Sequence, residues 1–168
     1  FGRALDQIEK GQNPFERQRA LTFRKDRRTQ AKAALQAPMS ENSTHGPLVR
    51  WLETLQWPEP VPREATHRVT LEHVLPRAHG DDWEDVFPDE NDREMCKHLL
   101  GNFCLIPFSM NNKLGNAGWQ QKRSEYARLS DSFKSAHEVA SERIWHAGIV
   151  RARTRRLAER AAKALGLE

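Results

Sequence analysis

The stretch VTLEHVLP, residues 69–76, decides the fold because it reads as a β-strand that ends on two polar side chains. Its hydropathy alternates with a period of two, as expected for a strand, and Pro76 ends it. One side of the strand carries the apolar residues Val69, Leu71 and Leu75. Glu72 and His73 stand next to each other near its end. A carboxylate and an imidazole make a poor apolar core, so the pair is a candidate catalytic site.

A second strand and a helix are predicted further along the chain. Residues 102–107, NFCLIP, predict a short strand that a proline closes. Residues 109–129 predict a helix that has Ser109 as its N-cap and is interrupted at Gly115 and Gly118. Two strands followed by a helix, with polar residues at each junction, predict a ββα unit.

Helical periodicity on both sides of this unit predicts a mostly α-helical α+β fold, with the ββα core embedded in surrounding helices. The predicted helices cover residues 2–36 (two helices), 47–57, 93–100 and 133–165. Gly101 is predicted to end the helix before it, as glycine often does. In the last helix, Arg153 is predicted on a face away from the apolar seam.

The domain organisation is predicted from composition. Residues 58–66, PEPVPREAT, form a proline-rich connector. It divides the chain into a helical N-terminal part, residues 1–60, and a core with C-terminal helices, residues 61–168. The chain begins with FGRALDQIEKG, which reads like the middle of a helix, so we expect it to be the C-terminal part of a longer protein.

The net charge is +4, from 27 Lys and Arg against 23 Asp and Glu, and this balance suits a polyanionic partner without identifying one. No apolar run approaches the ~20 residues of a membrane helix, and no signal peptide is visible. Cys96 and Cys104 have no C-x-x-C spacing, which argues against a disulfide framework or a zinc knuckle. The sequence therefore predicts a soluble, cytoplasmic protein without a membrane partner.

Several short motifs occur in an order typical of one group of nucleases. They are LEHVLPR at 71–77, Trp83, LLGNFCLIPFSMNNKLGNAGWQQKRSEY at 99–126 and WHAGIVRARTRRLAERA at 145–161. The set spans residues 67–162 and resembles the HNH nucleases, also called ββα-metal or His-Me finger nucleases. Among these it most resembles the C-terminal HNH domain of GmrSD-type modification-dependent restriction enzymes, including the phosphorothioation-dependent defence nuclease SspE.

The resemblance implies a metal-dependent DNA endonuclease, or nickase, as the effector domain of a prokaryotic anti-phage restriction system. It implies products with 5′-phosphate and 3′-hydroxyl ends. It also implies that the full-length chain has an upstream ParB-like nucleotide-hydrolysing domain, which senses DNA modification.

The resemblance also implies a role for each junction residue. His73 is the expected general base, and a neutral histidine, with an ordinary pKa of ~6.5, suits the removal of a proton from water at neutral pH. Glu72 and Asn111 are the expected ligands of Mg²⁺ or Mn²⁺, and Asn112 is the alternative to Asn111. Asn102 is expected to hydrogen-bond across the loop and hold the histidine's junction in shape.

Four basic residues are candidates for contact with DNA phosphates: Lys113, Lys122, Arg123 and Arg77. Lys122 matches a lysine of the family pattern. Two other functions stay open. One is a nucleic-acid-binding or interaction module that keeps the fold without turnover, and the other is an HNH toxin nuclease with a cognate inhibitor.

Overall fold

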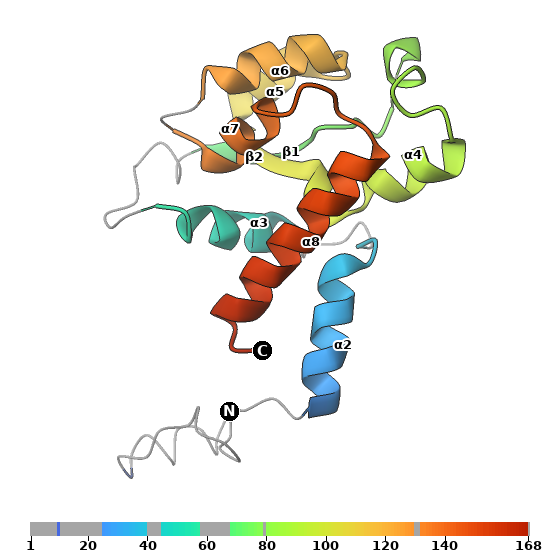
Figure 1. Cartoon of the computed structure of the whole chain (residues 1–168). Coiled ribbons are helices and arrows are strands. Elements are labelled where there is room, and N and C mark those ends of the chain that lie inside the picture. The colour runs from blue at the N-terminus through green and yellow to red at the C-terminus, as the bar shows by residue number, and fades with distance from the viewer. Residues whose placement is uncertain are drawn as a thin grey trace.

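The computed structural model describes Lys10 and residues 25–39, 45–57, 68–78, 80–129 and 132–167. The chain first forms α2 (Lys25–Gln36), α3 (His45–Thr54), β1 (Val69–His73), η2 (Asp81–Trp83), α4 (Glu90–Lys97) and η3 (Leu100–Asn102) (Figure 1). It continues as β2 (Phe103–Pro107), α5 (Phe108–Leu114), α6 (Trp119–Ala127), α7 (Lys134–Ala140) and α8 (Ala147–Ala164). The predicted mostly helical α+β class is confirmed. None of the described helices is long and apolar enough to span a bilayer.

The first predicted helix except for Lys10, the first half of the second predicted helix and the proline-rich connector lie outside the described residues. β1 and β2 pair as a two-stranded antiparallel sheet, with His73 opposite Phe103, and α5 follows β2 without a break. The predicted order of two strands and a helix is therefore confirmed. β1 ends at His73, earlier than predicted, because the next part of the chain turns away. There the N–H of Leu75 donates to the side chain of Asn102 at 2.8 Å instead of to a strand partner.

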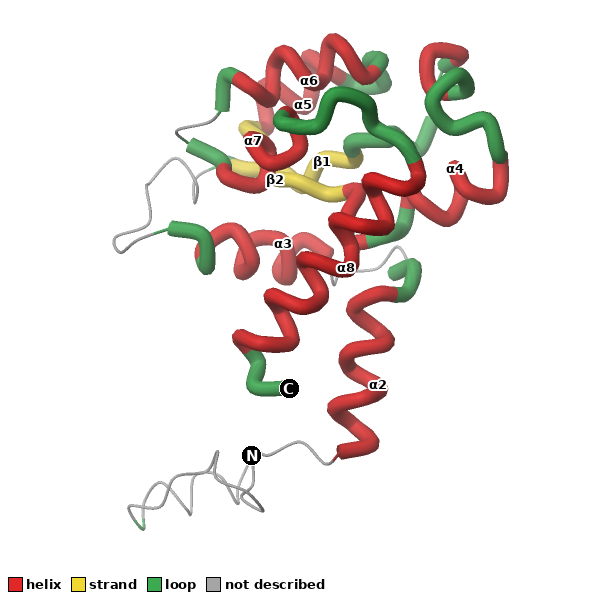
Figure 2. The backbone as a smooth tube through the Cα atoms, in the orientation of Figure 1, coloured by secondary structure: helices red, strands yellow, loops and turns green. Residues whose placement is uncertain are grey.

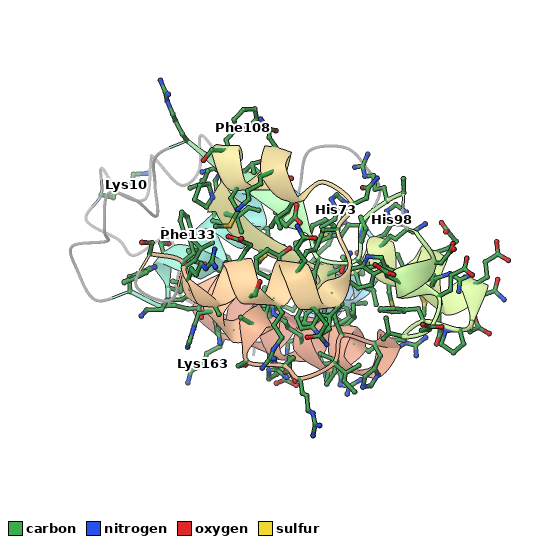
Figure 3. All side chains as sticks on the ribbon, turned by 90° about the horizontal axis from the view of Figure 1, so that it is seen from above. Lys10, His73, His98, Phe108, Phe133 and Lys163 are labelled. Atoms are coloured by element: carbon green, nitrogen blue, oxygen red, sulfur yellow. The ribbon has the colours of Figure 1, made fainter. Side chains whose placement is uncertain are left out.

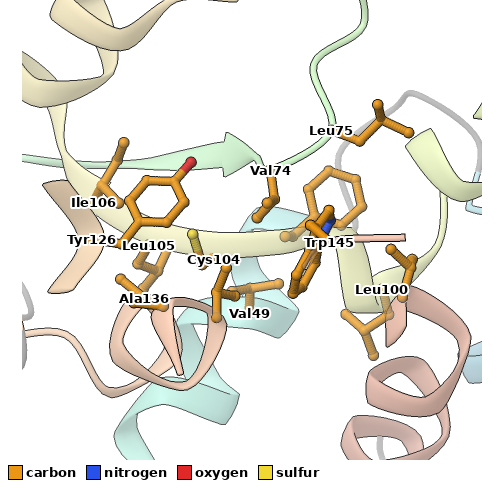
Figure 4. Packing of buried hydrophobic residues seen from close by; sticks show 14 of the residues in the cluster. Val49, Val74, Leu75, Leu100, Cys104, Leu105, Ile106, Tyr126, Ala136 and Trp145 are labelled. Atoms are coloured by element: carbon orange, nitrogen blue, oxygen red, sulfur yellow. The ribbon is translucent and has the colours of Figure 1, made fainter. Parts of the chain in front are cut away.

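The sheet lies between helices, with α5 and α6 above it and α3 and α8 below it in the view of Figure 2. Both α3 and α5 contact both strands. Residues 103–106 of β2 are buried because helices cover the strand on both sides. Figure 4 shows Leu105 of β2 among core side chains that include Val49 of α3 and Ala136 of α7. α3 thus shares its core with the sheet, and a domain boundary near residue 60 stays a prediction.

The helix predicted over residues 109–129 is divided into α5 and α6. Gly115 follows α5 with a φ of 46°, a backbone conformation that favours glycine, and it lets the chain turn there. The N-cap of α5 is Pro107, and the predicted N-cap Ser109 lies inside the helix. The long helix predicted for the C-terminal part is likewise divided, into α7 and α8.

Two predictions about the chain around β2 are wrong. Gly101 does not end a helix, because α4 ends at Lys97 and Gly101 lies in η3. A Cβ at Gly101 would lie 2.1 Å from the carbonyl oxygen of Val150 in α8, so close approach of the two segments requires glycine here. Arg153 of α8 is 1% exposed, and it donates to the carbonyl oxygens of Gly101 (2.8 Å) and Phe103 (2.7 Å). α8 therefore holds the chain where it enters β2.

Candidate active site

Glu72 is a buried carboxylate that α6 holds in place. It is 4% exposed, and its Oε1 accepts hydrogen bonds from Lys122 Nζ at 2.6 Å and Tyr126 Oη at 2.8 Å. Lys122 and Tyr126 are four residues apart, on one face of α6, and both are fully buried. Removing a charged group from water is costly unless a partner compensates it. The Lys122 ammonium is the partner that compensates the charge of Glu72.

His73, the next residue, has different surroundings. It is partly buried, and its ring packs edge-on against Phe103, its cross-strand partner, with ring centroids 4.7 Å apart. Arg77 Nε donates to His73 Nε2 at 3.4 Å. An arginine side chain can only donate, so Nε2 is the acceptor in this contact. Figure 3 shows His73 on the same side of the molecule as His98, away from Phe133.

Asn102 is fully buried and joins the end of β1 to the start of β2. Its Oδ1 accepts from the N–H of Leu75 at 2.8 Å, and its Nδ2 donates to the carbonyl oxygen of Leu75 at 3.0 Å. Longer contacts join Nδ2 to the carbonyl oxygen of Lys97 and Oδ1 to Trp145 Nε1, both at 3.4 Å. Because Leu75 lies two residues after His73, these bonds fix the turn that follows the histidine.

Asn111 lies on the same side of β1 as Glu72. Its Nδ2 is 3.4 Å from Thr70 Oγ1. Thr70 and Glu72 are two residues apart, so their side chains leave the strand on one side, roughly 7 Å apart along it. A carboxylate and an amide offer the oxygen ligands that Mg²⁺ and Mn²⁺ take, and Mg²⁺ needs few protein ligands. The two residues are thus of the chemical types that could hold such an ion, and Glu72 Oε2 is the oxygen to which Lys122 and Tyr126 do not donate.

A larger metal cluster is not found in the described part of the chain. There, no group of three or more His, Cys, Asp or Glu side chains could hold a metal ion together. Cys96 and Cys104 are both buried free thiols.

The four basic residues predicted to contact DNA differ in their access to solvent. Lys113 and Arg77 are exposed, and Arg123 is partly buried. Lys122 is 0% exposed. An ammonium enclosed in this way does not reach a DNA phosphate, so the structure favours an internal role for Lys122 over phosphate contact.

Tyr126 is a residue of this site that the sequence analysis missed. Buried residues recur along α6 and just beyond it at the spacing of one helix face: Trp119, Lys122, Tyr126 and Leu129. Lysine is almost never fully buried unless it is paired. A lysine within an apolar stripe was therefore the signal that could have revealed the buried pair.

Two further ionisable groups lie against Glu72. Cys104 is opposite Glu72 in the sheet, and burial, followed by the charge of Glu72, raises the pKa of its thiol far above the usual range. Burial also raises the pKa of Tyr126 well above its ordinary value, and the charge of Glu72 raises it further. Both groups stay protonated at neutral pH. Tyr126 is thus a hydrogen-bond donor to Glu72, and Cys104 is a neutral neighbour.

Comparison with known proteins places these residues in a family. The model of the C-terminal domain of GmrSD restriction endonucleases matches residues 14–160. No curated protein matches the chain significantly, and no solved structure does. The matched range includes both strands, α5 and α6, and so every residue of the candidate site. Because it covers most of the 168 residues, the chain belongs to the GmrSD restriction endonuclease C-terminal domain family and is a restriction-type nuclease domain.

Proposed function

We propose that this domain is an HNH endonuclease that depends on a divalent metal ion and nicks DNA with His73 as general base. The observation that carries the proposal is the partly exposed His73 ring, with Nε2 as an acceptor, at the end of β1 in a chain that belongs to a nuclease family. Two further features of the same junction support it. Glu72 and Asn111 carry oxygen donors there, and the buried Asn102 holds the backbone of Leu75 by hydrogen bonds.

In the proposed reaction, a water oxygen attacks the phosphorus of a DNA phosphodiester while the His73 ring takes a proton from that water. Nε2 is the atom suited to this, once the exposed Arg77 side chain turns from Nε2 to a DNA phosphate. The bond from phosphorus to the 3′ oxygen breaks, and the departing oxygen takes a proton from solvent. The products carry 5′-phosphate and 3′-hydroxyl ends. General base catalysis of this kind contributes about 10²–10⁴-fold to the rate.

Glu72 and Asn111 are the residues that we propose to hold Mg²⁺ or Mn²⁺. Such an ion, when bound, neutralises the negative charge that gathers on the phosphoryl and leaving oxygens. Asn102 holds the turn beside His73 so that the ring keeps its position during the reaction. Lys113 follows Asn111 on α5 and Arg123 lies on α6, and we propose that both contact the DNA backbone.

The biological setting that we propose is anti-phage restriction in a prokaryote. DNA is the substrate, and an upstream ParB-like nucleotide-hydrolysing domain in the full-length chain licenses cleavage. The family membership of this domain supports that setting. On this proposal, the domain by itself nicks DNA slowly and with little regard to sequence.

Plasmid nicking tests the proposed activity. We expect the purified chain to convert supercoiled plasmid to open circles with Mg²⁺ or Mn²⁺, and not with EDTA. Treatment with DNA ligase should reseal the circles, since only 5′-phosphate and 3′-hydroxyl ends can be joined. Intact plasmid in the presence of either metal would refute the proposal.

A pair of histidine variants tests the base. We expect His73→Ala to cut at least about 10²-fold more slowly than the parent. His137→Ala is the matched control, because His137 is exposed on α7 and belongs to no part of the site. Equal rates for His73→Ala and the parent would remove His73 from the reaction.

A further inference from the structure

Lys122 makes one contact that the proposed reaction does not use. Besides its bond to Glu72, its Nζ donates to the carbonyl oxygen of His73 at 2.8 Å. We propose that Lys122 is a positioning residue, which fixes the backbone of His73 and thereby the place of the general base. This inference rests on the proposed function of His73, and it gives Lys122 a role other than contact with DNA.

Because Lys122 is buried, its acceptors must stay in place for its hydrogen bonds to persist. The side chain is 0% exposed, so water cannot replace an acceptor that moves away. Hydrogen bonds are stronger in such an environment, and unmade ones cost more. The two acceptors belong to consecutive residues, Glu72 and His73. A shift of the strand end would therefore break both bonds of the ammonium at once.

The contact holds His73 without engaging its ring. The bond ends on the backbone carbonyl, while the ring packs against Phe103 and its Nε2 accepts from Arg77. Lys122 can therefore position the His73 ring through the backbone without a hydrogen bond to the ring nitrogen that accepts the proton. This is what a positioning residue requires.

Lys122 also completes a pair of anchors around the histidine. Asn102 holds Leu75, two residues after His73, by hydrogen bonds to both its N–H and its carbonyl oxygen. Lys122 holds His73 itself from α6. Tyr126, the other α6 residue that contacts Glu72, donates its hydroxyl to the carboxylate of Glu72.

Tyr126 therefore provides an internal comparison. Lys122→Met and Tyr126→Phe each remove one hydrogen bond to Glu72 Oε1, but only Lys122→Met also removes the bond to His73. We expect Lys122→Met to lower kcat by about 10- to 100-fold with the KM for DNA unchanged. Tyr126→Phe should lower kcat by less. Lys163→Met, which changes an exposed lysine of α8, should match the parent.

Kinetics distinguish this role from phosphate contact. If Lys122 bound a DNA phosphate, its replacement would raise the KM for DNA. It would also reduce the slope of log binding constant against log salt concentration by about one. That result for Lys122→Met, with kcat unchanged, would overturn the inference. So would a kcat of Lys122→Met no lower than that of Tyr126→Phe.

A second comparison covers the case in which Lys122→Met does not fold because Glu72 is left with an uncompensated charge. Glu72→Gln with Lys122→Met removes both charges of the pair together with the bond to His73, so no charge is left uncompensated, whereas Tyr126→Phe keeps that bond. Hydrogen exchange of residues 69–78 should be faster in the double variant than in Tyr126→Phe. Equal exchange would overturn the inference.

The exchange measurement needs no DNA cleavage, so it separates two kinds of failure. If the parent chain does not nick plasmid, the proposed function fails whatever the exchange rates are. If the parent nicks plasmid but exchange and kcat do not depend on Lys122, the positioning role alone fails.

Discussion

Replacing Asn102 with alanine should destabilise the fold and slow cleavage for the same reason, the loss of the turn after His73. The buried Asn102 side chain pairs with the N–H and the carbonyl oxygen of Leu75 at 2.8 and 3.0 Å. Alanine leaves both groups buried without a partner, at about 1–3 kcal/mol each, so we expect a loss of about 2–6 kcal/mol. That is a large part of the roughly 5–15 kcal/mol that stabilises a typical domain.

Urea unfolding followed by tryptophan fluorescence measures this loss. Asn112→Ala is the matched control, because Asn112 is exposed and such surface changes stay within about 0.5 kcal/mol. Hydrogen exchange at the Leu75 amide reports on the same bond. At a temperature where Asn102→Ala is still folded, its nicking rate should be about 10- to 100-fold lower than that of the parent. An unfolding free energy within about 0.5 kcal/mol of the parent would show that the reasoning is wrong.

Three other predictions concern packing, pH and thiol reactivity. Gly101→Ala should lower Tm by several degrees, because its Cβ would lie 2.1 Å from a backbone oxygen of α8. Gly80→Ala is the control and should leave Tm unchanged, because a Cβ there would have nothing within 4 Å. Equal Tm values for the two variants would contradict this. Burial alone would raise the pKa of Glu138, but the charges of Arg153 and other α8 arginines bring it below 4.5. A carboxylate with a lowered pKa stabilises the fold above pH 4.5, and this contribution is lost as the pH falls through the folded pKa. On lowering the pH through that range, Glu138→Gln should therefore lose less unfolding free energy than the parent. Parallel plots of unfolding free energy against pH would refute the effect. Burial raises the pKa of Cys96 to about 11, so iodoacetamide at pH 8 should label Cys96 only after unfolding, as mass spectrometry would show; rapid labelling of the folded protein would contradict its burial.

The strands could be predicted from the sequence because their signals are local. Alternation marks β1, a short apolar run marks β2, a proline ends or follows each strand, and the polar residues at the junctions mark the candidate site. The end of β1 could not be placed as well, because Asn102, from the far side of a long loop, takes the N–H of Leu75. A side chain that caps a strand from this distance in sequence leaves no local pattern.

The role of Lys122 could not be predicted from local sequence either. Its partners Glu72 and His73 lie about 50 residues earlier, and a helical lysine is ordinarily exposed. Arg153 was misplaced for the same reason: the carbonyl oxygens that it binds belong to the chain around β2. In both cases a charged residue stands on the apolar face of a helix, and only the packed structure supplies the acceptors.

The hydrogen bonds between α8 and the start of β2 can form only late in the synthesis of the chain. Gly101 donates its N–H to Thr154 Oγ1 at 2.9 Å, and Arg153 binds the carbonyl oxygens of Gly101 and Phe103. A ribosome that has already made both strands, α5 and α6 has yet to make these two α8 residues. Until they emerge, the start of β2 lacks these three hydrogen bonds to α8. If the domain cuts DNA as we propose, we therefore expect a chain still on the ribosome to cut more slowly than the finished domain.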